Sequence, residues 1–184
     1  MHRLIAALVA ATLLVILSSH LLDAQQRDAE PFAAEGIPVV PLPDPPVEYG
    51  TAEGQGIRVS VVTTGLTYPW GLAFLPDGSA LVTERLGALR VIREEALDPS
   101  PLSGVPEVFT GTALAGLMDV AVHPEFSDNR WVYLTYSKPT DAGSTVALAR
   151  GRLDGHVLSE VRDIFVSDAD GAAAGASRLL FAPD

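Results

Sequence analysis

The sequence predicts an exported all-β protein built from a repeated strand–turn–strand unit. A short basic start and a long apolar run open the chain, as in exported proteins. From residue 57 on, short apolar or alternating segments are separated by turn residues. The turn prolines Pro76, Pro124 and Pro183 recur 48 and 59 residues apart. A period of this size, with about four short strands per repeat, is typical of a β-propeller.

Residues 1–24 are predicted to be a signal peptide. Arg3 supplies the positive charge, residues 4–17 are uncharged, and the small Ala24 precedes the polar Gln25. An uncleaved membrane anchor is the alternative, but the apolar run is shorter than the roughly 20 residues that span a bilayer. We therefore expect cleavage after Ala24 and a periplasmic or secreted protein.

Residues 25–56 are predicted to be an acidic linker. Six prolines and four glycines interrupt this stretch, and it has no hydrophobic period. Proline fixes φ and lacks an N–H donor, so we expect neither a regular strand ladder nor a helix here.

Residues 57–110 are predicted to form the first blade. The strands that we expect are at 57–62, 72–75, 80–83 and 88–92. The first of them alternates as a half-buried strand does. The tripeptide Pro76-Asp77-Gly78 favours a tight turn, because proline presets φ, aspartate bonds the local backbone and glycine takes a positive φ.

The same arrangement returns over residues 116–167, which are predicted to form the second blade. Its expected strands are at 118–122, 131–136, 145–150 and 163–166. A third copy begins at 177–184, so we expect about two blades and the start of a third. One four-stranded unit cannot bury both of its own faces, so several blades are expected. A small complete sandwich that ends in the turn at 182–184 is the alternative, but a terminal turn without a return strand is not expected in such a fold.

Composition narrows the function classes. The formal charge of −11 disfavours nucleic acid and anionic membrane surfaces as partners, and the absence of cysteine excludes disulfides and thiolate metal sites. The sequence has no nucleophile-elbow, phosphate-loop or His-Glu-x-x-His motif, so hydrolase and nucleotide-driven functions have no support.

Several segments resemble a known family. They are 68–78 (YPWGLAFLPDG), 81–85 (LVTER), 101–106 (PLSGVP), 116–126 (GLMDVAVHPEF) and 177–181 (SRLLF). In this order they are similar to the N-terminal part of the soluble PQQ-dependent glucose/sorbosone dehydrogenases. The resemblance implies an exported six-bladed propeller that holds pyrroloquinoline quinone over a calcium ion. It also implies that a histidine base takes a proton from an aldose hydroxyl while hydride passes to the quinone.

The chain departs from the family pattern at two positions. Counting back from Arg178 puts Ala174 at the place of the family's histidine base, and alanine cannot accept a proton. Leu114 or Ala115 stands where the family usually has a glutamine that helps to hold the quinone. We therefore assign no catalytic residue, no cofactor-binding residue and no metal ligand in this chain.

Two histidines and one acidic turn are candidates from the residues alone. His123 lies in a His-Pro-Glu-Phe turn, where a structural role is expected, and His156 follows Gly155 in a predicted tight, exposed hairpin. Asp168 begins a stretch that is similar to the start of a calcium loop. The closing glutamate of such a loop is missing, because Leu179 stands there, so a surface turn is expected.

Two acidic residues and one aromatic residue lie within apolar segments. Glu84 is expected to form a structural ion pair with Arg85 or another arginine. Asp119 interrupts an apolar strand and is likewise expected to have a partner. Trp70 is expected in the core rather than at a ligand.

Two functional hypotheses follow. The first is the N-terminal part of an exported PQQ-dependent sugar dehydrogenase-like protein that oxidises aldoses or related sugar alcohols. Its partners would be a small sugar and an electron acceptor. The second is a non-catalytic propeller of the same lineage that binds a partner or a carbohydrate.

Overall fold

The computed structural model describes residues 42, 46–112, 114–169, 171 and 177–183. The chain divides into two units, Met1–Pro38 and Val39–Asp184, and all described residues belong to the second. The predicted signal peptide and most of the predicted linker therefore lie outside the described residues. No helix within the described part of the chain is long and apolar enough to cross a membrane.

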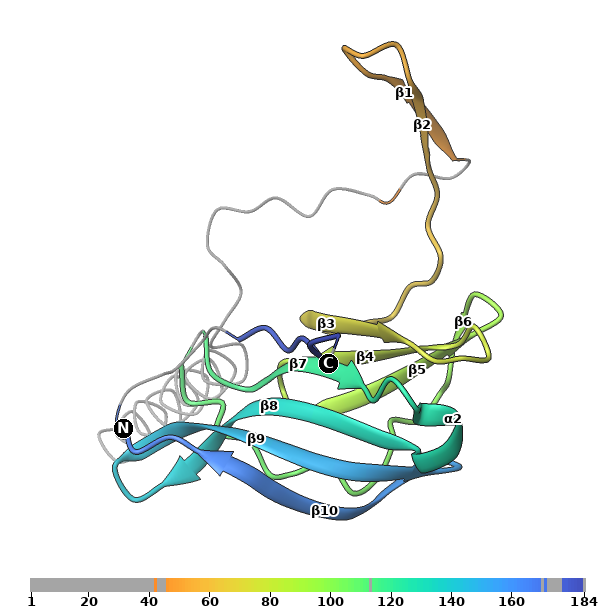
Figure 1. Ribbon diagram of the computed structural model, residues 1–184. Coiled ribbons are helices and arrows are strands. Elements are labelled where there is room, and N and C mark those ends of the chain that lie inside the picture. The colour runs from red at the N-terminus through yellow and green to blue at the C-terminus, as the bar shows by residue number, and fades with distance from the viewer. Residues whose placement is uncertain (1–41, 43–45, 113, 170, 172–176, 184) are drawn as a thin grey trace, which may run out of the picture. The chain divides into compact units, whose positions relative to one another are not determined.

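Two four-stranded antiparallel sheets form the body of the described part of the chain (Figure 1). The first sheet contains β3 (Pro69–Phe74), β4 (Ala80–Glu84), β5 (Ala88–Arg93) and β6 (Ala96–Leu97). The second contains β7 (Leu117–Val122), β8 (Trp131–Thr140), β9 (Gly143–Asp154) and β10 (Val157–Val166), with the one-turn helix α2 (Phe126–Asn129) between β7 and β8. Each strand pairs with the next in the chain, which confirms the predicted all-β repeat. The two sheets are two propeller blades.

A separate hairpin corrects two predictions. It consists of β1 (Val47–Gly50) and β2 (Gly56–Val59), which pair only with each other. The predicted linker thus does form a ladder, because no proline lies between Val47 and Gly50. The strand predicted over 57–62 ends at Val59 and is exposed rather than half-buried, because a two-stranded hairpin offers no second layer to cover it.

The predicted turn between β3 and β4 is confirmed. The Gly78 N–H donates to the Leu75 carbonyl at 3.0 Å, and Gly78 has a φ of +85°, which glycine adopts without strain. Asp77 Oδ1 accepts hydrogen bonds from the N–H and the hydroxyl of Ser79 at 3.0 and 2.5 Å. These hydrogen bonds hold the pKa of Asp77 below its ordinary value.

The main core lies between the two blades. Its buried members include Leu75, Leu81, Leu89 and Val91 from the first blade, and Val120, Val132, Leu134 and Tyr136 from the second. A smaller apolar cluster of Ala80, Val82 and Ile92 lies on the other face of the first blade. On that face Leu72 and Phe74 are 49% and 72% exposed.

The internal repeat explains why the first blade is also apolar on the face that points away from the second blade. The register pairs Leu72 with Val82 in the first blade and Val120 with Leu134 in the second. Val120 and Leu134 are the residues with which the second blade packs on the first. The open face of the first blade therefore has the apolar pattern of a blade with a neighbour on each side.

A threonine hydroxyl connects the first strands of the two blades, β3 and β7, which we call the innermost strands. Thr83 Oγ1, on β4, accepts the Gly71 N–H of β3 at 2.8 Å and donates to the Met118 carbonyl of β7 at 2.5 Å. All three residues are buried. One side chain thus satisfies a backbone donor in its own blade and a backbone acceptor in the next.

The second blade repeats this arrangement. Thr135 is the equivalent of Thr83 in the register, and its Oγ1 accepts the Asp119 N–H at 3.0 Å. Thr135 Oγ1 also bonds the hydroxyl of Ser177, which lies at the same distance from its turn proline as Met118 does. Residues 177–183 form no strand, but the Leu179 N–H donates to Asp119 of β7, so this segment lies beside β7, where the innermost strand of a third blade belongs.

We predict that Thr83→Val destabilises the protein by about 1–3 kcal/mol. The substitution keeps the shape of the side chain but leaves a buried N–H and a buried carbonyl without this partner. The free energy of unfolding in urea measures the loss. Thr64→Val, at an exposed position, is the matched control and should change stability by less than about 0.5 kcal/mol. Equal stability of the two variants would show that the hydroxyl bridge contributes nothing.

Candidate functional site

The innermost strands β3 and β7 approach each other closely at Gly71. A Cβ atom at this position would lie 2.9 Å from Asp119 Oδ1 and 3.1 Å from Asp119 Cα. Only glycine therefore allows this contact without a shift of the backbone of β7. The equivalent position in the second blade holds Asp119, so the two repeats differ at the point where they meet.

Asp119 is the most deeply buried carboxylate of this junction, with 2% of its side chain exposed. Its Oδ2 accepts the Leu179 N–H at 2.6 Å, and its Oδ1 lies 3.5 Å from Arg178 Nη1. The Arg178 side chain is 72% exposed, so this guanidinium also faces solvent. The expected structural partner of Asp119 is confirmed, and it comes from the third repeat. Asp119 thus fixes the backbone that follows residues 172–176.

Arg85 contacts both the loop that precedes β7 and the segment that precedes β3. The side chain is buried, and its Nη1 donates to the carbonyls of Thr112 and Ala115 at 3.2 and 3.4 Å. Its guanidinium carbon lies 5.1 Å from the ring centroid of Tyr68, in a cation–π contact. This arginine therefore holds the loop that leads into β7 against the segment that leads into β3.

Glu84 has the structural ion pair that the sequence predicts, although its partner is not the neighbouring Arg85. Glu84 Oε2 lies 3.4 Å from Arg90 Nη1, and Oε1 accepts the Thr67 N–H at 2.5 Å. Both side chains of the ion pair are largely buried. Arg90 is the partner because β4 and β5 are antiparallel neighbours, a pairing that sequence adjacency does not reveal.

His123 has the predicted structural role. Its Nδ1 accepts the Glu125 N–H at 3.0 Å and lies 2.8 Å from Asn129 Nδ2. Its ring stacks against Tyr133 and meets Phe181 edge to face. These contacts place His123 in the turn that leads into α2, and they join the second blade to the start of the third repeat.

The other residues singled out by sequence have structural or surface positions. His156 is exposed in a two-residue hairpin turn, as predicted, and its Nε2 lies 3.0 Å from the Ser100 carbonyl. Asp168 is exposed, while Asp170 of the same stretch lies outside the described residues. Trp70, expected in the core, is only half-buried.

A polar cluster that sequence reasoning missed lies on β8 and β10. Asp163 accepts hydrogen bonds from the Tyr136 hydroxyl at 2.7 Å and from Lys138 Nζ at 2.6 Å. Burial, followed by the hydrogen bond to Asp163, raises the pKa of Tyr136 above its ordinary value. The tyrosine is thus held neutral, as a hydrogen-bond donor. The alternation of β8 could have indicated that Tyr136 and Lys138 share a face.

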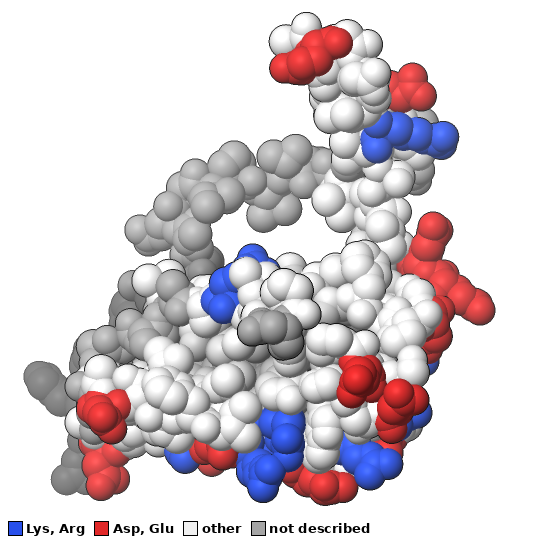
Figure 2. All heavy atoms as spheres, viewed as in Figure 1, with Lys and Arg blue, Asp and Glu red and all other residues white. Residues whose placement is uncertain are grey.

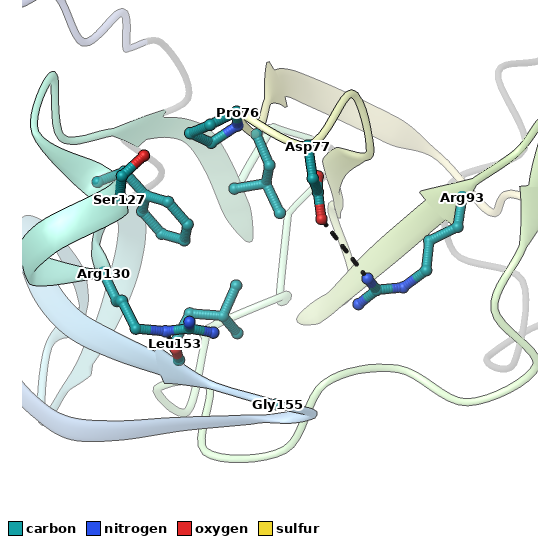
Figure 3. Close-up of a pocket in the computed structure, with 9 residues that line it drawn as sticks. Pro76, Asp77, Arg93, Ser127, Arg130, Leu153 and Gly155 are labelled. Carbon is teal, nitrogen blue, oxygen red and sulfur yellow. Dashed lines mark hydrogen bonds and ion pairs between the residues drawn. The ribbon is translucent and has the colours of Figure 1, made fainter.

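A pocket lies at the opposite end of the innermost strands, between the two blades (Figure 3). We call it the turn-end pocket, and it has a volume of about 270 Å³. Its lining residues are Leu75, Pro76, Asp77, Arg93, Phe126, Ser127, Arg130, Leu153 and Gly155. Among the described residues there is no group of three or more His, Cys, Asp or Glu that could hold a metal ion.

Comparison with known proteins assigns the family. The glucose/sorbosone dehydrogenase family matches residues 66–184, which include both blades and the start of the third repeat. The chain belongs to the glucose/sorbosone dehydrogenase family. The resemblance predicted from the sequence motifs is therefore confirmed.

Two curated relatives and one solved structure illustrate the similarity. The aldose sugar dehydrogenase of Escherichia coli is 40% identical over 109 residues, which cover 58% of this chain and 29% of that protein. Quinoprotein glucose dehydrogenase B of Acinetobacter calcoaceticus is 26% identical over 102 residues, 53% of this chain and 21% of that protein. The crystal structure of the apo soluble aldose sugar dehydrogenase of E. coli matches with a TM-score of 0.60 at 35% identity, covering 66% of this chain and 37% of that one. The chain thus spans less than a third of the length of these curated relatives.

The sequence predicts departures from the family pattern at Ala174 and at Leu114 or Ala115, and the latter two lie in the loop that leads into β7. Ala115 is fully buried beneath Arg85, and Leu114 is 57% exposed. Neither side chain has a polar atom with which to contact a quinone. Ala174 lies outside the described residues, a few positions before Arg178 and Leu179, which Asp119 holds.

We predict that Asp119→Ala speeds tryptic cleavage after Arg178 by about tenfold. Trypsin needs an extended, released backbone, and loss of the carboxylate removes the acceptor of the Leu179 N–H together with the ion pair of Arg178. A loss of about 1.4 kcal/mol corresponds to that factor. Mass spectrometry of the released C-terminal peptide gives the rate.

Asp128→Ala, at an exposed position on α2, is the matched control for this measurement. It removes one carboxylate and leaves the contacts of Arg178 and Leu179 unchanged. Cleavage at the same rate in the wild type and in both variants would contradict the role assigned to Asp119.

Proposed function

We propose that this chain is part of an exported PQQ-dependent sugar dehydrogenase-like protein that oxidises aldoses or related sugar alcohols. The observation that carries the proposal is the family match over residues 66–184, supported by two blades whose innermost strands repeat the same interblade contact. The names of the relatives, an aldose sugar dehydrogenase and a quinoprotein glucose dehydrogenase, support the substrate class and the quinone.

The residues of this chain do not by themselves fit a catalytic centre. Removal of hydride from an alcohol carbon needs a base within hydrogen-bond reach of the hydroxyl. Ala174 stands at the family's base position, and no metal-binding group occurs among the described residues. We therefore assign to these two blades the role of scaffold. Through Asp119 they hold the Leu179 backbone and contact Arg178 beside β7.

A second candidate function is a non-catalytic propeller that binds a carbohydrate or another partner. Ala174 is the specific observation that favours it, since loss of the base would remove the chemistry and leave the fold intact. Under either function, residues 1–24 would direct export, and the protein would act in the periplasm or after secretion.

We predict that the 184-residue chain shows no aldose-dependent dye reduction when PQQ and Ca²⁺ are supplied. The methyl group of Ala174 accepts no proton, and no other described residue is assigned as a base. The E. coli aldose sugar dehydrogenase, assayed in parallel, is the positive control. Dye reduction by the 184-residue chain above the rate without sugar would overturn this prediction.

The same assay on the natural full-length protein separates the two functions. The dehydrogenase function requires both quinone absorbance after addition of PQQ and Ca²⁺ and sugar-dependent dye reduction. The binding function requires carbohydrate or partner binding with no dye reduction. Absence of dye reduction by the full-length protein, with the positive control active, would contradict the dehydrogenase proposal.

A further inference from the structure

The turn-end pocket combines an apolar floor with two guanidinium groups. Leu75, Phe126 and Leu153 belong to the buried core and supply the apolar surface. Arg93 reaches the pocket from the end of β5 on one side, and Arg130 reaches it from the end of α2 on the other (Figure 3). Each blade therefore contributes one arginine and part of the floor.

Arg130 is held in place before any ligand arrives. It is the C-cap of α2 with a φ of +57°, an uncommon conformation for a residue other than glycine, and its N–H donates to the Phe126 carbonyl at 2.8 Å. Its Nε donates to the Leu153 carbonyl at 2.7 Å, which directs the guanidinium along the wall of the pocket. Fixing the side chain in this way lowers the entropy that a ligand contact would cost.

The acidic partners of the two arginines do not neutralise them strongly. Asp77, the only carboxylate in the lining, lies 4.0 Å from Arg93 Nη1 and is already hydrogen-bonded to Ser79. Asp98 lies 3.3 Å from Arg93 Nε, and Asp154 lies 4.0 Å from Arg130 Nε. The side chains of both arginines are 45% exposed, and exposed ion pairs of this kind contribute only about 0–1 kcal/mol. An incoming anion can therefore compete for both guanidinium groups.

The mixed charges around the turn-end pocket favour a ligand with one negative charge over a polyanion. Figure 2 shows acidic and basic side chains interspersed along the edge of the second blade, without a large field of one sign. A polyphosphate would meet Asp77, Asp98 and Asp154 within or beside the pocket. A volume of about 270 Å³ lies below the about 300–1,000 Å³ of sites for drug-sized ligands, so the ligand must be small.

The pocket is distinct from the junction at the beginning of the innermost strands. Its lining includes Leu75 and Pro76, which follow the last residue of β3, whereas Ala174 precedes the third innermost segment. A strand of six residues separates the two ends, which is about 20 Å. A ligand in the turn-end pocket would therefore not contact Arg85, which lies at the other end of β3.

We propose that the turn-end pocket binds a small organic monocarboxylate with an apolar body. The carboxylate lies between Arg93 and Arg130, and the apolar body covers Leu75, Phe126 and Leu153. This site is independent of the proposed dehydrogenase function, because neither its residues nor its position depends on the quinone or on the sugar.

Titration of the 184-residue chain with benzoate, followed by ¹⁵N chemical shifts, tests the proposal. We expect saturable binding with a Kd of about 1 mM or tighter, a reasonable affinity for a ligand of this size. The amides that shift should be those of Asp77, Ser127 and Gly155. Benzyl alcohol lacks the charge and acetate lacks the apolar body, so each should bind at least about tenfold more weakly.

Two variants and a matched control localise the binding. Arg130→Gln and Arg93→Gln should each raise the benzoate Kd by about tenfold, because each removes a charge-assisted contact to the carboxylate. Arg152→Gln is the control, since its side chain is 44% exposed and paired with acidic residues but lies outside the lining. Thermal unfolding of each variant confirms that it is folded, and the Arg93 variant leaves the α2 cap intact.

Several outcomes would overturn the proposal. No shift changes up to about 10 mM benzoate would do so, because that concentration is about tenfold above the expected Kd. Binding that the two arginine variants leave unchanged, or that Arg152→Gln weakens equally, would place the carboxylate elsewhere. Equal affinity for benzyl alcohol would show a purely apolar site.

Discussion

The contact between β3 and β7 is the interaction on which the arrangement of the two blades depends. Thr83 accepts a backbone N–H from its own blade and donates to a backbone carbonyl of the next, so its hydroxyl satisfies two buried groups at once. The strands can come this close only because Gly71 has no Cβ. Around this junction the apolar side chains of both sheets form one core.

The second blade keeps the bridge and changes what surrounds it. Thr135 repeats the bond to the innermost strand and to the following repeat, while Asp119 replaces the glycine. The carboxylate accepts the Leu179 N–H and pairs with Arg178. The second junction is therefore held by a charged contact, whereas the first is held by close backbone packing at Gly71. The two blades thus share their backbone geometry at the junction and differ in the side chain at this position, glycine in the first and aspartate in the second.

Much of the fold could be predicted from periodicity and turn chemistry. The Pro76-Asp77-Gly78 turn, the four strands of the second blade and the partnered carboxylates Glu84 and Asp119 follow from local patterns. In the first blade the predicted strand at 57–62 lies outside the sheet, and the short β6 was not predicted. The hairpin of β1 and β2 could not be predicted in this way. The prolines before Val47 suggested an irregular segment, although the strand Val47–Gly50 itself contains no proline. The partner of Glu84 is fixed by the β4–β5 register, which residue order does not contain.

The two threonine bridges and the turn-end pocket depend on contacts between repeats, which a single sequence does not display. Thr83 lies 7 residues after Pro76, whereas Thr135 lies 11 residues after Pro124, because α2 lengthens the second turn. Alignment on the turn prolines therefore does not bring out their equivalence, which only the strand register shows. The pocket draws Arg93 and Arg130 from different blades, and nothing in their local sequence indicates that they line the same pocket. The match over residues 66–184 shows the family, whereas the assignment of Ala174 to the family's base position stays a prediction.

Native-state hydrogen exchange of the Gly71 and Asp119 amides tests the threonine bridge most directly. Both N–H groups donate to a threonine hydroxyl of the neighbouring strand rather than to a backbone carbonyl. We expect both amides to exchange only through global unfolding, with the same opening free energy as the most protected amides of β4 and β8. Opening free energies as low as those of the exposed β1–β2 hairpin would contradict it.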